Sequence, residues 1–151
     1  MFRKENPMKI NPYLNFPGNT EEAFKFYKSI FGGEFTALNR IKEMPESEKL
    51  APEDQEKIMH IALPIGQGNM LMATDALESM GQTLTEGNNI SLILDVDSEE
   101  EADTLFEKLA VGGVAEMPME KMFWGSYYGL VVDKFGIRWM LNYPMMKEEE
   151  K

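Results

Sequence analysis

The chain has 151 residues, no cysteine, and 26 acidic against 15 basic residues, which gives a formal net charge of −11. A soluble chain of this length buries about 68–70% of its unfolded surface, so it can fold without disulfides or a structural metal. The lack of cysteine excludes disulfides, thiolate metal sites and a cysteine nucleophile, and the negative charge argues against nucleic acid and anionic membrane surfaces as partners.

Residues 1–9 lack the apolar stretch of a signal peptide, and the longest apolar runs have the length of strands. We therefore expect a cytoplasmic protein with no membrane partner. Much of the charge lies in residues 43–57 and 147–151, which we interpret as a solvated loop and tail rather than an acidic recognition patch.

The first half of the chain begins with a strand signal at residues 10–16, followed by a helix signal. Asn19 and Glu22 have the spacing of a capping box, and Gly32-Gly33 can end the helix in a left-handed conformation. An apolar stripe recurs between them at helical spacing, made of Ala23, Phe26, Tyr27 and Ile30. Further strands are predicted over 34–43, 57–65 and 69–75, with a hairpin at Gly66-Gln67-Gly68.

The second half repeats this order of elements. A strand signal at 89–97 precedes a helix signal that opens at Ser98 and Glu101, again with capping-box spacing, and ends at Gly112-Gly113. The apolar stripe of this helix stands 79 residues after the first one, at Ala102, Leu105, Phe106 and Leu109. The remaining strands are predicted over 114–120, 125–133 and 136–143, with a turn at Asp133–Gly136.

The constant offset indicates an internal duplication, and each copy reads β-α-β-β-β. The sequence therefore predicts an α+β fold in which one domain, residues 8–144, is built from two modules. We place the modules at 8–75 and 89–144 with a linker at 76–88, and we expect flexible ends at 1–7 and 145–151.

Alternation along the predicted strands separates two faces. The apolar set should pack under the helices and comprises Ile10, Pro12, Leu14, Phe16, Met59, Ile61, Leu63, Ile65, Ile90, Leu92, Leu94, Val96, Ile137, Trp139 and Leu141. The second set is mixed and more polar, and comprises Asn11, Tyr13, Asn15, His60, Ala62, Ser91, Ile93, Asp95, Arg138, Met140 and Asn142. This second face meets solvent, a partner subunit or a cavity, and function should be sought there.

Five stretches carry a family resemblance: PYLNF (12–16), EEAFKFYKSIFGGEF (21–35), IMHIAL (58–63), NMLMATD (69–75) and FWGSYYGLVVDKFGIRWMLN (123–142). With this pattern of modules the chain resembles the PhnB-like branch of the vicinal oxygen chelate superfamily, which includes glyoxalase I, bleomycin resistance proteins and extradiol dioxygenases. The resemblance implies eight strands forming one mixed sheet curled into a cup, with the helices on its convex side, and a homodimer. The mixed polar face would line the cup.

Metal-using members of this superfamily hold one divalent ion with ligands from four strands. Carried over by motif, those positions fall at Asn11, Met72, Ser91 and Met140. Thioether, amide and hydroxyl groups are poor ligands for a hard cation without a carboxylate beside them, and only Asp75 and Asp95 lie near. We therefore predict no metal at these positions and no cofactor.

His60 is the only histidine in the sequence and has a cup-facing position. Because its free pKa lies near working pH, it could act as a general base or hydrogen-bond a ligand. The alternative is a hydrogen-bonded pocket or interface histidine without chemistry.

Aromatic residues follow at Trp124, Tyr127 and Tyr128, where Gly125 and Gly129 leave room for a flat ligand. They could equally pack in the core or at a dimer interface, and alternation allows only one of the two tyrosines to face the cup. Arg138 could clamp a carboxylate or phosphonate, although we favour an ion pair with a nearby acid. The methionines Met70, Met72 and Met140 could form a pliable apolar pocket or simply fill the core.

Phosphate-loop, dinucleotide-turn, zincin and nucleophile-elbow motifs are missing from the sequence, and nothing in it resembles a methyl-donor nucleotide site. Two functions stay open: a metal-free cup that binds a small organic molecule, and a superfamily enzyme of lyase, transferase or dioxygenase type that uses a metal or His60 as base. A purely structural interaction module is a third possibility, but it would not need so polar a face. The predicted ligand-binding residues are Asn11, Tyr13, Asn15, His60, Met72, Ser91, Trp124, Tyr128, Arg138 and Met140.

Overall fold

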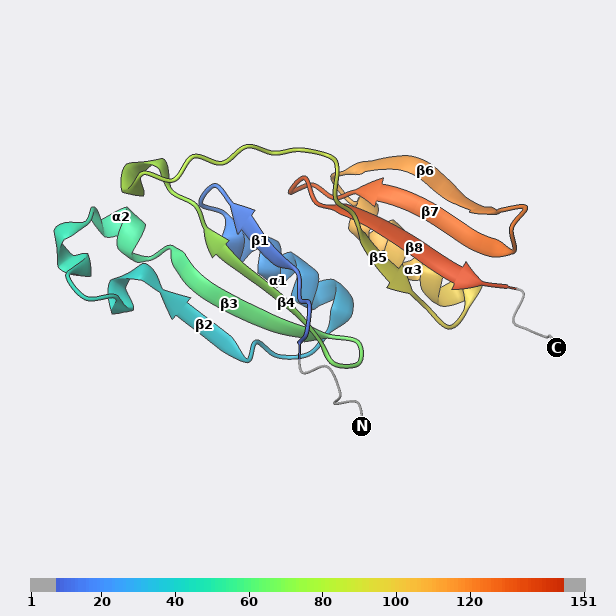
Figure 1. The fold of residues 1–151 in the computed structure, drawn as a ribbon, viewed down its shortest axis with the longest axis horizontal. Coiled ribbons are helices and arrows are strands. Elements are labelled where there is room, and N and C mark those ends of the chain that lie inside the picture. The colour runs from blue at the N-terminus through green and yellow to red at the C-terminus, as the bar shows by residue number, and fades with distance from the viewer. Residues whose placement is uncertain (1–7, 146–151) are drawn as a thin grey trace, which may run out of the picture. The chain divides into compact units, whose positions relative to one another are not determined.

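Each half of the chain forms a four-stranded sheet with one long helix, in the computed structural model that describes residues 8–145 (Figure 1). The first sheet has the strand order β1-β4-β3-β2. Its elements are β1 (Tyr13–Phe16), α1 (Thr20–Phe31), β2 (Ala37–Arg40), β3 (Ile58–Ile65) and β4 (Asn69–Asp75).

The second sheet has the matching order β5-β8-β7-β6. Its elements are β5 (Leu92–Asp95), α3 (Glu99–Ala110), β6 (Val114–Lys121), β7 (Ser126–Val132) and β8 (Arg138–Pro144). In both sheets the first and last strands pair in parallel and the other pairs are antiparallel. The predicted β-α-β-β-β modules and the α+β class are confirmed.

The duplication extends to single positions. Ala23 and Ala102 are each the fourth residue of a 12-residue helix, and both are fully buried. The chain divides into compact units at residues 1–84 and 85–151. The single domain over 8–144 stays a prediction. The predicted flexible ends lie outside the described residues except for Met145, whose backbone N–H donates to the Gly125 carbonyl oxygen at 2.8 Å.

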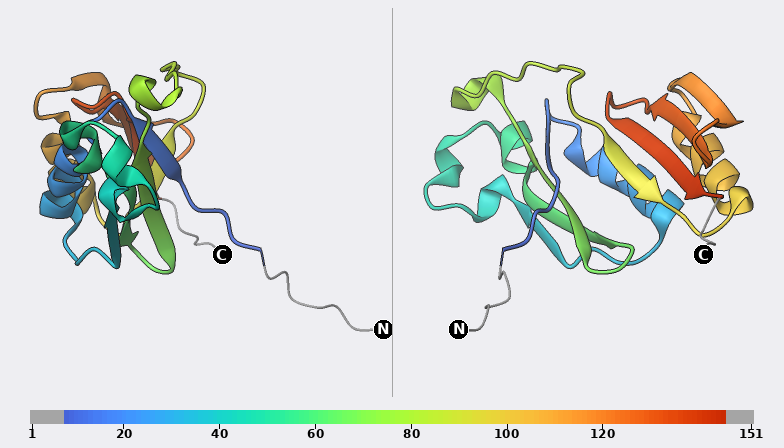
Figure 2. Two further views of the ribbon diagram at one scale, coloured as in Figure 1. Left: turned by 90° about the vertical axis from the view of Figure 1, so that its left-hand side faces the viewer. Right: turned by 45° about the vertical axis from the view of Figure 1, so that its right-hand side comes forward.

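One face of each sheet packs against its helix. Figure 2 shows α1 lying along the first sheet, and α1 buries Ala23, Phe24 and Tyr27 there. The strand residues on this face are Phe16, Ile61, Leu63, Leu71 and Ala73, and in the second sheet they include Val131, Trp139 and Leu141. Burying each large apolar side chain contributes about 1.5–3 kcal/mol. No α-helix covers the opposite face of either sheet within the residues that the structure describes, and we call these faces the open faces.

Two residues of the predicted apolar set are largely exposed to solvent. Ile10 is 95% exposed and Ile90 is 74% exposed, because each lies outside its strand. The first strand starts late because Pro12 has no N–H to donate, while its carbonyl oxygen accepts from the Met72 backbone at 3.1 Å. Just before it, the Asn11 side-chain oxygen accepts from the Met70 backbone N–H at 3.2 Å and takes the place of a strand pairing.

The two long helices begin in different ways. Ser98 accepts from the Glu101 backbone N–H at 3.0 Å, as predicted, but the Glu101 side chain accepts from Asp97 rather than closing the capping box on Ser98. Asn19 makes no cap bond, so the predicted box at α1 is wrong. Asp75, at the end of β4, accepts instead from the backbone N–H groups of Thr20 (3.0 Å) and Ile58 (2.8 Å). Its carboxylate also favours the positive end of the helix dipole.

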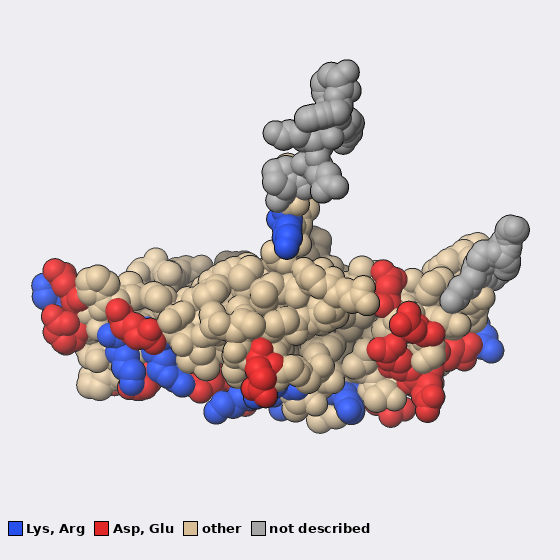
Figure 3. Space-filling model, turned by 90° about the horizontal axis from the view of Figure 1, so that it is seen from below, with Lys and Arg blue, Asp and Glu red and all other residues tan. Residues whose placement is uncertain are grey.

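The first module has an insertion between β2 and β3, where the sequence predicted a solvated loop, and the short helical turns in it were not predicted. Residues 34–43 form only the short strand β2, because the chain then turns into η1 (Ile41–Glu43), η2 (Ser47–Lys49) and α2 (Pro52–Gln55) before β3. The linker also holds a short turn, η3 (Glu78–Met80). Figure 3 shows acidic and basic side chains interleaved at the end of the first module where α2 lies.

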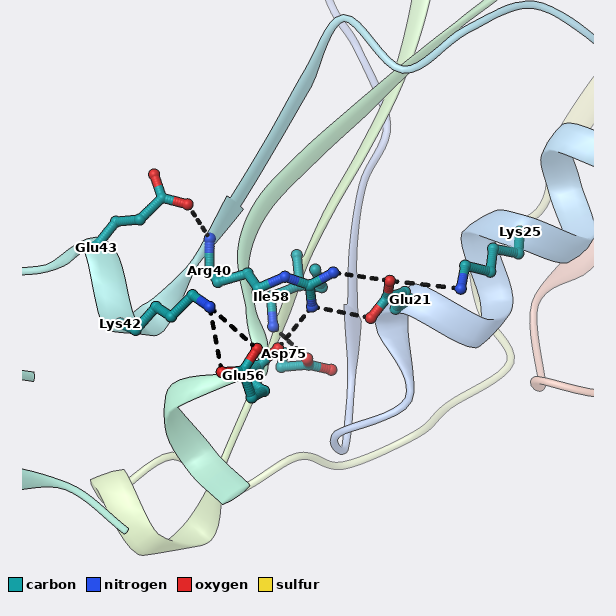
Figure 4. Close-up of polar contacts among 8 residues, drawn as sticks. All are labelled: Glu21, Lys25, Arg40, Lys42, Glu43, Glu56, Ile58 and Asp75. Carbon is teal, nitrogen blue, oxygen red and sulfur yellow. Dashed lines mark hydrogen bonds and ion pairs between the residues drawn. The ribbon is translucent and has the colours of Figure 1, made fainter. Parts of the chain in front are cut away.

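Arg40 ties this insertion to α1, as Figure 4 shows. Its guanidinium donates to both carboxylate oxygens of Glu21 at 2.9 Å and to the Glu56 carbonyl oxygen at 2.8 Å. The hydrogen bonds from Arg40 lower the pKa of Glu21. Lys42 pairs with Glu56 nearby at 3.2 Å, but both of those side chains are half exposed. Bidentate, partly buried pairs are the stronger kind, so Arg40 carries most of the attachment.

We expect Arg40→Met to lower the free energy of unfolding by about 1–2 kcal/mol at pH 7, measured by urea denaturation. Because the pKa of Glu21 is lowered in the folded chain, the stabilisation is present above its ordinary value of 4.5 and is lost as pH falls through the folded-state value. The difference between the two proteins should therefore shrink at pH 3.

Lys42→Met is the matched control, since it removes an exposed pair in the same insertion and should cost less than about 0.5 kcal/mol. Equal losses in the two variants, or a difference for Arg40→Met that does not change with pH, would contradict the role given to the Glu21 pair.

Candidate functional site

The open face of the first module carries the predicted residues Tyr13, His60 and Met72. Strand register places Tyr13 beside Met72 and Met72 beside Ala62, while His60 lies two residues from Ala62 on the same strand. Tyr13 is 45% exposed, His60 and Met72 are half-buried, and Ala62 is buried. The sheet therefore brings together three residues that are 12 to 59 positions apart in sequence.

Tyr13 and His60 are in direct contact. The Tyr13 hydroxyl lies 3.0 Å from His60 Nδ1, and the two rings stack with centroids 5.8 Å apart at 22°. Partial burial raises the pKa of the Tyr13 hydroxyl. The phenol can thus donate to Nδ1 and fix the imidazole in the tautomer that carries its proton on Nε2.

The predicted asparagines have different surroundings. Asn11 uses its side-chain oxygen on the Met70 backbone, so that oxygen has a structural role. Asn15 is exposed and lies beside Thr74 on the open face.

The open face of the second module carries Tyr128, Arg138 and Met140. Tyr127 points the other way, toward α3, where its hydroxyl donates to Asp103 at 2.6 Å. This hydrogen bond, helped by burial, raises the pKa of Tyr127 to about 12. The choice that alternation left open is therefore decided: Tyr128 is on the open face and Tyr127 is not.

An aromatic cluster stands beside Tyr128. The Trp124 ring meets Tyr128 at 6.2 Å and Phe123 at 5.1 Å, both edge to face. Trp124 is 55% exposed and Phe123 is 96% exposed, at the tip of the β6–β7 hairpin. Phe123 was not among the predicted site residues, although its position next to Trp124 in the sequence could have indicated that it belongs to the same cluster.

Arg138 forms the ion pair that we favoured from the sequence. Its guanidinium lies 3.3 Å from a Glu116 carboxylate oxygen, and 19% of the Arg138 side chain is exposed. The Arg138 Nε atom is buried and has no hydrogen-bond partner among the described residues. The arginine is thus already neutralised, and it is not a free clamp for an anion.

The four positions that would hold a metal in related enzymes do not suit one. Met72 and Met140 occupy matching places in β4 and β8, whereas Asn11 and Ser91 precede the strands β1 and β5. Their donors are two thioethers, an amide and a hydroxyl, and the amide oxygen is already bonded to a backbone N–H. Within residues 8–145, no group of three or more His, Cys, Asp or Glu side chains could hold a metal ion. These residues do not fit the metal centre of the superfamily.

A row of polar side chains crosses the second open face and was missed as a unit. Register aligns Asp95 with Asn142, Asn142 with Tyr128, and Tyr128 with Glu120, one residue from each strand. The Asn142 side chain donates to Asp95 at 2.8 Å. Only Tyr128 of these four was predicted as a ligand-binding residue, because strand pairing has to be known before the row can be recognised.

An open pocket of about 770 Å³ lies elsewhere, at the start of α1. Its charged walls include Glu21, Arg40, Lys57 and Asp75. These groups bind one another or the backbone: Arg40 holds Glu21, Lys57 donates to the Gly18 carbonyl oxygen at 2.8 Å, and Asp75 caps α1. The pocket therefore lies at the packing contact between the insertion and α1, and we do not assign it a ligand.

The predicted site residues fall into two groups, one in each module. Asn11, Tyr13, Asn15, His60 and Met72 belong to the first module, and Ser91, Trp124, Tyr128, Arg138 and Met140 to the second. In the part of the chain that the structure describes, no helix is both long and apolar enough to cross a membrane.

Known proteins are similar to this chain in sequence and in fold. The family model described as 3-demethylubiquinone-9 3-methyltransferase matches residues 8–142. The chain is 38% identical to protein PA1353 from Pseudomonas aeruginosa, whose crystal structure superposes with a TM-score of 0.79 and covers 90% of this chain and 97% of that one. It is 30% identical to a PhnB protein from Bacillus cereus, with a TM-score of 0.72 and coverage of 90% and 99%.

A more distant likeness shows the wider fold group. A glyoxalase/bleomycin resistance protein/dioxygenase family enzyme from Burkholderia phytofirmans is 20% identical, with a TM-score of 0.58 and coverage of 87% of this chain and 96% of that one. At this identity the match speaks for the fold alone. The family model and the two nearer structures identify the chain as a member of the PhnB-like family, and the more distant structure shows that it has the fold of a glyoxalase/bleomycin resistance/dioxygenase family enzyme.

Proposed function

We propose that this PhnB-like protein binds a small organic molecule on the open faces of its sheets without using a metal. The observation that carries the proposal is the exposed aromatic cluster Phe123, Trp124 and Tyr128, which stands over an open sheet face. Contiguous exposed apolar patches mark interaction or ligand-binding sites, and flat ligands gain from stacking on aromatic rings.

The first module supports the same function with a different surface. Tyr13 and His60 form a stacked, hydrogen-bonded pair that presents both an aromatic edge and polar atoms. Met72 beside Tyr13 adds a polarisable, flexible wall. Such a mixture of apolar walls with a few oriented polar groups is typical of small-molecule sites. In keeping with the resemblance, we also propose that the protein is a cytoplasmic homodimer.

A second candidate function is acid–base catalysis by His60. It is favoured by one contact, the 3.0 Å approach of the Tyr13 hydroxyl to His60 Nδ1. If the phenol holds Nδ1, Nε2 is the nitrogen left to exchange a proton with a substrate. The methyltransferase description of the family model has no comparable support, since the sequence lacks a nucleotide-binding loop.

Two neighbouring tyrosines provide the test of the binding proposal. A library of small aromatic molecules is screened by thermal shift, and the hits are measured by calorimetry against Trp124→Leu, Tyr128→Leu and Tyr127→Phe. Losing one aromatic contact should raise Kd about three- to tenfold in the first two variants. Trp124→Leu should leave the stability of the free protein nearly unchanged, because that ring is 55% exposed.

Tyr127→Phe is the control and should behave in the opposite way. It removes the hydrogen bond to Asp103 and should lower the free energy of unfolding by about 1–2 kcal/mol without changing Kd. Because the pKa of Tyr127 is raised from 10 to about 12, this contribution is complete below pH 10 and is lost as pH rises through 12. If Kd changes in Tyr127→Phe but not in Trp124→Leu or Tyr128→Leu, the ligand site does not lie on the open face.

The metal-free part of the proposal is tested by elemental analysis. Purified protein, dialysed separately against Ni, Zn, Mn and Fe salts, should retain far less than one ion per chain, because the four superfamily positions supply no carboxylate or imidazole. Retention of one ion per chain, abolished in His60→Ala, would instead support the enzyme and give His60 the role of a ligand.

A further inference from the structure

The polar row on the second open face carries uncompensated negative charge. Asp95 and Glu120 stand at its two ends, in the outer strands β5 and β6, and both are exposed. Asp95 accepts a hydrogen bond from the neutral amide of Asn142, which leaves its charge in place. No basic side chain among the described residues forms an ion pair with Asp95 or Glu120.

The basic residues of this sheet do not offset that charge. The only basic residues in the strands β5–β8 are Lys121 and Arg138. Lys121 aligns with Tyr127, on the helix side, and lies 3.9 Å from Glu99 of α3. Arg138 is on the open face but is paired with Glu116. The potential over this face is therefore negative.

The aromatic cluster lies on the same row. Tyr128 is the third member of the row, and its ring contacts Trp124, which contacts Phe123. The face of an aromatic ring carries negative charge density and attracts a cation within about 6 Å of its centroid, most strongly when the ring is a tryptophan. The aromatic rings and the carboxylates thus both favour a cationic ligand.

The repeated module shows that the fold does not require these charges. The matching row in the first sheet contains Asn15 beside Thr74, and Asn39 beside His60. Ile61 pairs with Ala73 between β3 and β4, and His60 and Thr74 are the residues that adjoin this pair. Asn15 and Asn39 thus stand where the second module has Asp95 and Glu120. The same row can be built with neutral amides at both ends, so the fold itself does not account for the two carboxylates.

We infer that the open face of the second module binds a flat aromatic cation, such as an aromatic quaternary ammonium compound or a protonated heteroaromatic amine. The ligand ring lies against Trp124 and Tyr128, and Asp95 and Glu120 supply the counter-charge. This inference rests on the proposed function and specifies the class of ligand for one of its two faces.

The experiment uses three probes that share a benzyl or phenyl ring and differ in charge: benzyltrimethylammonium, benzyl alcohol and benzoate. Each is titrated at pH 7 into the full chain, and binding is followed by NMR chemical shifts of the protein. We expect the cation to bind at least about fivefold more tightly than the alcohol, and benzoate to bind more weakly than either. Added sodium chloride should weaken only the binding of the cation appreciably.

Four variants locate the site and separate charge from contact. Asp95→Asn and Glu120→Gln should each raise Kd for the cation about two- to fivefold and leave that of the alcohol unchanged. Trp124→Leu should weaken the binding of both the cation and the alcohol. Glu107→Gln is the control, because it removes an exposed carboxylate from α3 and should change neither.

The outcomes distinguish this inference from the function on which it rests. If the alcohol or benzoate binds as tightly as the cation, with the same dependence on Trp124, the aromatic site stands and the preference for a cation is overturned. Cation binding that is equally weakened by Glu107→Gln, or unaffected by Trp124→Leu, reflects only the net charge of the chain and also overturns it. If none of the three probes binds while the library yields other ligands that depend on Trp124, the inference fails and the proposed function survives.

Discussion

The parallel pairing of the first and last strands in each module determines what each sheet can present. A parallel pair cannot be closed by a tight turn, so the chain has to leave β1 or β5, cross over and return. The helix packs on one face during that crossing, and the two remaining strands complete the sheet beside the last strand. One face is thereby committed to a hydrophobic core, with Trp139 and Tyr27 among its largest side chains, and the other is left available.

Much of this arrangement follows from local patterns in the sequence. The helices end within a residue or two of their predicted limits because an apolar stripe and a following glycine act over single turns. Gly66–Gly68 and Asp133–Gly136 form the predicted hairpin connections for the same reason. The 79-residue offset between Ala23 and Ala102 comes from the same local helix pattern occurring in both modules, and the two alanines are equally buried.

Other features depend on partners that are distant in sequence, and these could not be predicted. Asp75 reaches α1 from 55 residues away and makes the expected cap at Asn19 unnecessary. Strand alternation alone could not show that Ile10 and Ile90 fall beyond the paired segments. Alternation did separate the two faces and assigned His60 and Tyr128 to the faces that the helices leave open. The contact of His60 with Tyr13 and the alignment of Glu120 with Tyr128 appear only once register is known.

The connection between the third and fourth elements of each module is used in two ways. In the first module, residues 41–57 form a folded excursion held by Arg40, and in the second, residues 122–125 make a tight link that displays Phe123 and Trp124. Lengthening a surface connection costs little, because closure entropy grows only slowly with its length. After the duplication, this connection could therefore diverge between the two modules while the sheet beneath it was preserved. Exchanging the two connections between modules would likewise change the surface groups that each sheet displays without redesigning its core.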